Sequence, residues 1–203
     1  MNIFGLFISF GLLLVAMSIH EFSHGWIAYK LGDTTAKYQG RLTLNPLAHI
    51  DPIGTILLPI FLFIVSRGQF VFGAAKPVPI NYWALKNPKK DMLWIGLAGP
   101  AANLLAALLC SQILKILPEA NILAVLLKNF AIINIVLGVF NLIPIPPLDG
   151  SRILTAVLPS EMARGYARLE SFGFFIIMIF IAFGLFDFIV WPIVYRIIAI
   201  LGL

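Results

Sequence analysis

The chain has 203 residues, 61% of them hydrophobic and 11% charged, and its mean hydropathy is +0.99. This composition excludes an ordinary soluble domain and indicates an integral membrane protein in contact with the lipid bilayer. The formal net charge is +5, but the Lys and Arg residues stand in short blocks beside long apolar runs, as topology signals do. Nucleic acid is therefore not expected as a partner.

Four apolar stretches are long enough to cross about 30 Å of hydrocarbon, which needs about 20 residues of helix. They lie at about 3–29, 92–117, 121–142 and 171–200. The first is not expected to be a cleaved signal peptide, because Met1–Met17 contains no basic residue. The last is open to two interpretations, one span or a span followed by an interfacial helix, with a break near Trp191-Pro192.

A fifth apolar stretch, 53–66, is shorter and contains Pro59, so its length fits a re-entrant or interfacial element as well as a span. The Lys and Arg residues decide between the two. If 53–66 does not span, nearly all the basic blocks between the helices lie on one face of the membrane, as the positive-inside rule favours. We therefore predict a non-spanning element, an amino terminus outside the cell and a cytoplasmic loop after the first helix.

Residues 37–52 place apolar Leu42 and Leu44 between polar neighbours and end in Asn-Pro and Asp-Pro turn signals. This pattern predicts a short strand or hairpin, whose edge could hold an extended peptide. The predicted fold is an all-α polytopic membrane protein with about four to five transmembrane helices and a small membrane-associated β-hairpin and re-entrant region at about 36–90. It is expected to form a single domain, 1–203.

The first helix contains the motif H-E-F-S-H at residues 20–24. His20 and His24 are four residues apart and share a helix face, where two imidazoles can bind one zinc ion while Glu21 deprotonates a water molecule on the metal. The alternative is a hydrogen-bonded packing cluster, but an unpaired Glu costs at least about 2.5 kcal/mol at the bilayer centre. The helix rises about 25 Å from Ile3 to His20, so we expect the motif about 5–10 Å from the cytoplasmic boundary, within reach of water.

A catalytic zinc site usually has three protein ligands, so a third ligand is expected elsewhere in the chain. Asp149 lies in N-L-I-P-I-P-P-L-D-G, where prolines end the preceding helix and present the aspartate from an extended segment. Its alternative role is to cap a short helix at 151–158. If 53–66 does not span, Asp149 emerges on the same cytoplasmic side as His20 and His24, which favours the role of ligand.

Two asparagines interrupt the apolar helices. Asn103 lies in G-P-A-A-N, and Asn141 begins the proline-rich segment. Either amide could donate to the oxyanion of a tetrahedral intermediate. Either could instead link two helices, which is worth about 0.6 kcal/mol on average. Asn134 and the single cysteine, Cys110, are given no chemical role.

The three motifs H-E-F-S-H, G-P-A-A-N and N-L-I-P-I-P-P-L-D-G, in this order, resemble the signature elements of the site-2 protease family of intramembrane zinc metalloproteases. The resemblance covers about residues 15–155. Its two family asparagines match Asn103 and Asn141 and are implied to steady the substrate or the intermediate. Family members often carry a PDZ or CBS domain, and this sequence contains neither.

The same resemblance implies that His20, His24 and Asp149 bind one zinc ion per chain and that Glu21 is the catalytic base. The implied activity is that of an endopeptidase that cleaves in or near the transmembrane helix of a membrane-protein substrate, in a multi-pass protein of the cell membrane. Association into a homo-oligomer is left open. The alternatives are a membrane metal-binding or transport protein, for which paired broken helices in an internal repeat are missing, and an inactive relative that only binds helices.

Overall fold

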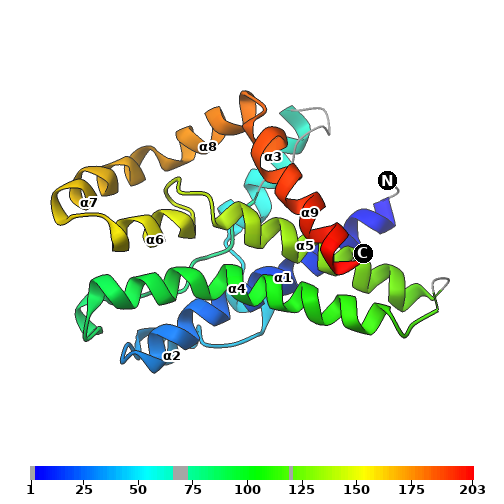
Figure 1. Ribbon diagram of the computed structural model, residues 1–203, viewed down its shortest axis with the longest axis horizontal. Helices are drawn as coiled ribbons and strands as arrows, with labels where there is room; N and C mark the ends of the chain where they lie inside the picture. Colours follow the sequence, from blue (N-terminus) through cyan, green and yellow to red (C-terminus); the bar gives the residue numbers. More distant parts are fainter. Residues whose placement is uncertain (1–2, 66–72, 119–120) are drawn as a thin grey trace.

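The computed structural model describes residues 3–65, 73–118 and 121–203, which are helical apart from turns and loops (Figure 1). The α-helices are α1 (Ile3–Lys30), α2 (Thr35–Tyr38), α3 (Leu58–Val65), α4 (Pro88–Leu114), α5 (Ile122–Asn141), α6 (Asp149–Val157), α7 (Ser160–Ala167), α8 (Gly173–Ala182) and α9 (Trp191–Leu201). Short 3₁₀ or π turns lie at Pro46–His49, Pro52–Leu57, Tyr82–Ala84, Arg168–Phe172 and Phe186–Val190.

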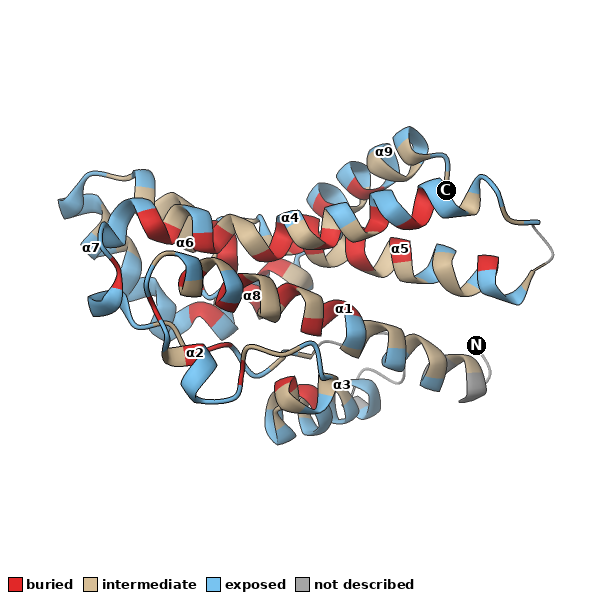
Figure 2. Cartoon of the chain, turned by 90° about the horizontal axis from the view of Figure 1, so that it is seen from below, coloured by how far each residue is buried: buried red, intermediate tan, exposed pale blue. Residues whose placement is uncertain are grey.

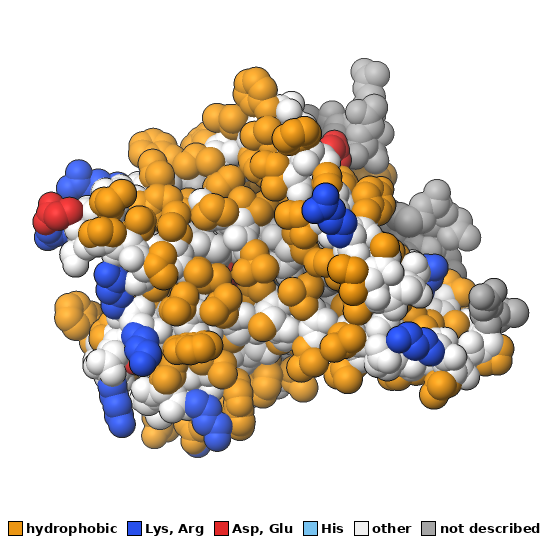
Figure 3. All heavy atoms as spheres, in the orientation of Figure 1, with side chains coloured by type: hydrophobic (Ala, Val, Ile, Leu, Met, Phe, Trp, Pro, Cys, Tyr) orange, Lys and Arg blue, Asp and Glu red, His pale blue; other side chains and the backbone are white. Residues whose placement is uncertain are grey.

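Four helical stretches are long and apolar enough to cross a membrane: Phe7–Lys30 in α1, all of α4, all of α5, and the continuous run Ser160–Ala182. This confirms an all-α protein with four candidate spans, the first three close to the predicted positions. Hydrophobic side chains cover most of the face seen in Figure 3, as expected of a surface that contacts lipid.

The fourth stretch ends much earlier than the predicted segment at 171–200. Gly184 takes a left-handed conformation, with φ of +68°, which glycine adopts at little cost and which stops α8. The expected break near Pro192 does not interrupt a helix, because Pro192 stands in the first turn of α9, where proline is tolerated. The π turn Phe186–Val190 leads directly into α9, but this run is not among the four stretches that are long and apolar enough to span. The buried Val194 of α9 joins the apolar core formed with α5.

The predicted β-hairpin at 37–52 is wrong: over these residues the structure has the end of α2, a turn at Gly40 and a 3₁₀ turn, and no strand. The segment that lies beside His49 in the structure supplies the physical reason. Lys76 N–H does donate to His49 O at 2.9 Å, but Pro77 and Pro79 have no N–H, so a ladder cannot continue. The peptide-holding role expected of this edge therefore has no strand to support it among the described residues.

Helices α1 and α4 run antiparallel. Ala16 O accepts from the side chain of Asn103, and His24 bonds Ile95 O farther along α1 and earlier along α4. The connection 31–87 therefore starts and ends at the same end of this helix pair. A single membrane crossing by 53–66 would have placed its two ends on opposite sides, so the arrangement agrees with a non-spanning stretch. Residue 66, like 67–72, lies outside the described residues. Buried residues gather where α4 faces α1, α5 and α6 (Figure 2).

Candidate active site

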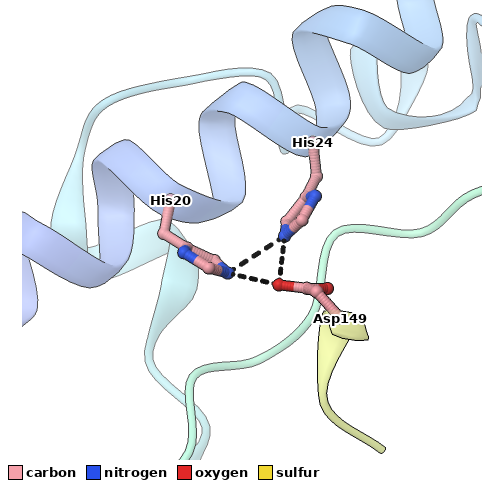
Figure 4. Close-up of side chains that lie close together, drawn as sticks. All are labelled: His20, His24 and Asp149. Carbon is pink, nitrogen blue, oxygen red and sulfur yellow. Dashed lines mark hydrogen bonds and ion pairs between the residues drawn. The ribbon is translucent and has the colours of Figure 1, made fainter. Parts of the chain in front are cut away.

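Three buried side chains converge where α1 meets the start of α6 (Figure 4). Nε2 of His20 lies 2.8 Å from Oδ2 of Asp149, and Nε2 of His24 lies 3.1 Å from the same oxygen. The two Nε2 atoms are 3.0 Å apart. The structure therefore brings together the three residues that the sequence proposed as metal ligands.

The other nitrogen of each ring fixes its tautomer. His24 Nδ1 donates to Ile95 O at 2.6 Å, since a carbonyl oxygen can only accept. His20 Nδ1 faces Asn103 Oδ1 at 2.6 Å. The nitrogen of the Asn103 amide donates to Ala16 O at 3.1 Å and to Asn134 Oδ1 at 2.7 Å, so it is the amide oxygen that faces His20. An amide oxygen can only accept, and His20 Nδ1 is therefore also a donor. Both Nε2 atoms consequently present lone pairs.

Two nitrogen lone pairs and a carboxylate oxygen that face one another at 2.8–3.1 Å repel unless a cation lies among them. Neutral imidazoles and a carboxylate are the usual protein ligands of catalytic zinc, and tetrahedral ligand atoms at zinc distances lie about 3.3 Å apart. The donor set and its spacing therefore fit zinc.

Gly99 lets α4 pass this cluster closely. A Cβ at this position would lie 2.6 Å from His20 Nε2 and closer still to His24 Nε2. No real Cβ has such contacts, so any other residue at position 99 would displace the imidazoles.

Asp149 is the first residue of α6, after the N-cap residue Leu148, and the structure shows no side-chain capping bond for this helix. Its capping role, the alternative weighed from sequence, is thus not supported. Arg152 Nη1 lies 3.5 Å from its second oxygen, Oδ1.

Glu21 is half-buried beside His20 and is not part of the three-residue cluster. Its Oε2 accepts a hydrogen bond from the main-chain N–H of Val78 at 2.8 Å. Oε1 makes no hydrogen bond to a described residue, and it is therefore the oxygen that remains available to a reacting group.

Comparisons with known proteins agree with this geometry. The model of Peptidase family M50 matches residues 111–185. A Bacillus subtilis protein named "Putative zinc metalloprotease YwhC" is 38% identical over 190 residues, which cover 89% of this chain and 82% of the relative. The chain belongs to peptidase family M50, the site-2 proteases.

More distant relatives of this M50 protease carry similar names. "Putative zinc metalloprotease Rip2" of Mycobacterium tuberculosis is 33% identical over 83% of this chain, and "Zinc metalloprotease MJ0392" of Methanocaldococcus jannaschii is 30% identical over 87%. The chain spans 64% and 42% of their lengths. No solved structure gives a significant match.

The two asparagines of the family motifs lie in different surroundings in this M50 protease. Asn103 is fully buried and holds the ring of His20, and both hydrogens of its amide are already used on Ala16 and Asn134. It therefore has no free donor for an oxyanion. Asn141 donates to Leu137 O of its own helix at 3.0 Å and makes no hydrogen bond to His20, His24 or Asp149.

Asn134, which sequence reasoning left without a role, completes the support of His20. It is fully buried in α5, its Oδ1 accepts from Asn103, and its nitrogen donates to Phe130 O at 2.8 Å. The available signal was an amide in the middle of a 20-residue apolar helix, where polar groups usually have a partner. The partner itself could be named only from the structure.

Replacement of Asn134 by leucine is expected to lower zinc affinity about 10- to 100-fold, the usual effect of losing an outer partner of a metal ligand. The amide of Asn103 loses the acceptor that orients it, so the ring of His20 is held less firmly. Competition with a chromogenic chelator measures the affinity. Ser111→Ala is the matched control, because Ser111 is equally buried but bonds only within α4; equal affinities of the two variants would contradict the role of Asn134.

Proposed function

We propose that this chain is an intramembrane zinc metalloendopeptidase that hydrolyses a peptide bond in or near a transmembrane segment of a membrane-protein substrate. The observation that carries the proposal is the convergence of His20 Nε2, His24 Nε2 and Asp149 Oδ2 between helices long and apolar enough to span a membrane. Membership of family M50 supports the same chemistry.

A zinc ion bound by these three residues supplies activation of a water molecule and polarisation of the scissile carbonyl. Glu21 takes the proton of the attacking water at Oε1 and delivers it to the leaving amine. Asn103 and Asn134 act on the reaction through His20, whose ring they hold. The chain thus supplies one complete site, and one zinc ion per chain is proposed.

The aromatic residues near the C-terminal end of α1 support the placement of the active site close to the membrane boundary. Trp26 is 41% exposed, with Lys30 Nζ 4.8 Å from its ring centroid, and Lys37 Nζ lies 4.9 Å from the ring centroid of Tyr29. Aromatic rings beside lysines are typical of the membrane-water interface. His24 precedes Lys30 by about 9 Å along the helix, so water can reach it from this side. Together with the positive-inside rule, this supports a cytoplasmic active site and an amino terminus outside.

The proposed partners are the lipid bilayer and the transmembrane helix of a substrate. A helix hides its carbonyl groups in its own hydrogen bonds, so the substrate has to unwind locally before the scissile carbonyl can be attacked. All three ligands and the base come from one chain. A homo-oligomer is therefore not needed to complete the site.

Removal of zinc is expected to abolish cleavage of single-span membrane proteins reconstituted with the purified protease, and added zinc is expected to restore it. The measurement is mass spectrometry of the products after treatment with a strong chelator, with zinc content followed in parallel. The products should end in or near the membrane segment.

Two results would refute the proposal. One is cleavage that continues at full rate after metal analysis shows the zinc to be gone. The other is zinc flux through sealed vesicles with no cleavage of any substrate in the panel, which is the behaviour of a transport protein.

A further inference from the structure

An extended segment, Lys76-Pro77-Val78-Pro79-Ile80-Asn81, crosses α1 beside the candidate active site, and we call residues 76–81 the Pro-Val-Pro strap. Pro77 and Pro79 have no N–H. Val78 is therefore the only main-chain donor between Lys76 and Ile80, and it donates to Glu21 Oε2 at 2.8 Å. The one N–H group in this stretch is therefore bonded to the proposed catalytic carboxylate.

The amino end of the strap is anchored by a buried guanidinium. Arg41 is 8% exposed and its Nη2 donates to Lys76 O at 2.7 Å, while Lys76 N–H donates to His49 O at 2.9 Å. Burial of a charged side chain costs free energy that such charge-assisted bonds offset. The contact holds the main chain one residue before Pro77.

The carboxyl end is anchored by a buried carboxylate. Asp33 is 1% exposed, and its Oδ2 accepts from the N–H of Asn81 at 2.6 Å while its Oδ1 accepts from the N–H of Thr35 at 2.9 Å. Two buried charges outside the metal-ligand cluster therefore fix the two ends of the strap, with Val78 between them.

The side chain of Val78 fixes the distance between strap and helix. Val78 is 5% exposed, and a Cβ on Gly25, one turn after Glu21, would lie 3.0 Å from its Cγ1. The absence of a side chain at Gly25 lets the strap lie directly on α1. The Val78 N–H is consequently held in place by its own packing as well as by the anchors.

We propose that the main-chain amide of Val78 positions the Glu21 carboxylate for catalysis. The inference rests on the proposed function, in which Glu21 is the base. A glutamate side chain has three rotatable bonds, and the bond to Oε2 selects one arrangement and leaves Oε1 for the reacting water. Val78 is a positioning residue: its amide acts through Glu21 and makes no hydrogen bond to the three proposed ligands. Proline on both sides keeps its backbone extended at low entropic cost.

The test replaces Val78 with its α-hydroxy acid, so that an ester without N–H stands where the amide was and the side chain is unchanged. The expected result is a kcat about 10- to 100-fold lower, the scale of a small misplacement of a catalytic group, with KM, zinc content and melting temperature unchanged. Ile80 replaced by its α-hydroxy acid is the matched control, because the N–H of Ile80 makes no hydrogen bond to a described residue. A second, genetic pair is Val78→Pro, which lacks the donor, against Val78→Ala, which keeps it.

Equal kcat values for the two esters, with cleavage by the wild type that depends on Glu21, would overturn the positioning role and leave the proposed function intact. Zinc content or melting temperature that falls together with kcat in the Val78 ester would also overturn it, because the strap would then only support the fold. Cleavage that survives Glu21→Gln would overturn the proposed function itself.

Discussion

Glu21→Gln is expected to reduce peptide-bond cleavage about 10²- to 10⁴-fold, the usual contribution of general base catalysis, while zinc stays bound. Glutamine cannot take a proton from water at neutral pH. Its amide oxygen can still accept from Val78 N–H, as Oε2 of Glu21 does, so the fold around the strap is retained. The three ligand atoms belong to other residues. The measurements are kcat on a reconstituted single-span substrate and zinc content by elemental analysis.

Glu161→Gln is the control for loss of a glutamate charge, because Glu161 is exposed on α7 and pairs only with Arg164. This variant should cleave at the wild-type rate. Full activity of Glu21→Gln would eliminate Glu21 as the base. Loss of zinc from the same variant would show instead that Glu21 belongs to the metal site.

Asp149→Ala is expected to lose bound zinc and, with it, all activity. The variant removes the one oxygen among three ligand atoms, so its effect on zinc affinity should exceed the about 10- to 100-fold that loss of an outer partner costs. The remaining pair, Nε2 of His20 and of His24, cannot complete a site that usually needs three protein ligands. Elemental analysis of the purified protein gives the zinc content directly.

Asp91→Ala is the matched control for a buried carboxylate at the start of a helix. Asp91 is buried in the first turn of α4 and accepts from the N–H of Asn87 at 2.9 Å, so its loss should lower stability and leave zinc bound. Asp149 makes no such capping bond in α6. Stoichiometric zinc in Asp149→Ala would remove the third ligand and the mechanism built on it.

The long helices could be predicted because length and apolarity suffice to identify a span. α1, α4 and α5 begin and end near the predicted residues. The fourth span was misplaced because the apolar run continues past Gly184, where only the backbone conformation ends the helix. The hairpin prediction was wrong because it used only the alternation of Leu42 and Leu44 with polar residues. A strand also needs a neighbouring segment with main-chain N–H groups to pair with, and the alternation carries no information about that.

The cluster of His20, His24 and Asp149, the proposed metal site, could be predicted because its requirements are local or topological. The spacing of His20 and His24 places them on one helix face, and the antiparallel course of the chain brings Asp149 to the same end. The roles of the amides could not be predicted in this way. Whether Asn103 donates to an oxyanion or accepts from His20 depends on which atom of its amide faces the ring, and that is decided by Asn134 on another helix.

Asp149 follows His24 by 125 positions in the chain, which gives the site a fixed order of assembly. At about 5–20 residues per second, a ribosome needs about 6–25 s to go from the second ligand to the third. During this time the nascent chain has the histidine pair and the proposed base, but it lacks the third proposed ligand. With the proposed ligands, a chain that stops short of residue 149, or whose α4 inserts in the wrong direction, is expected to be inactive, so proteolysis should begin only after the helices have assembled in their final order.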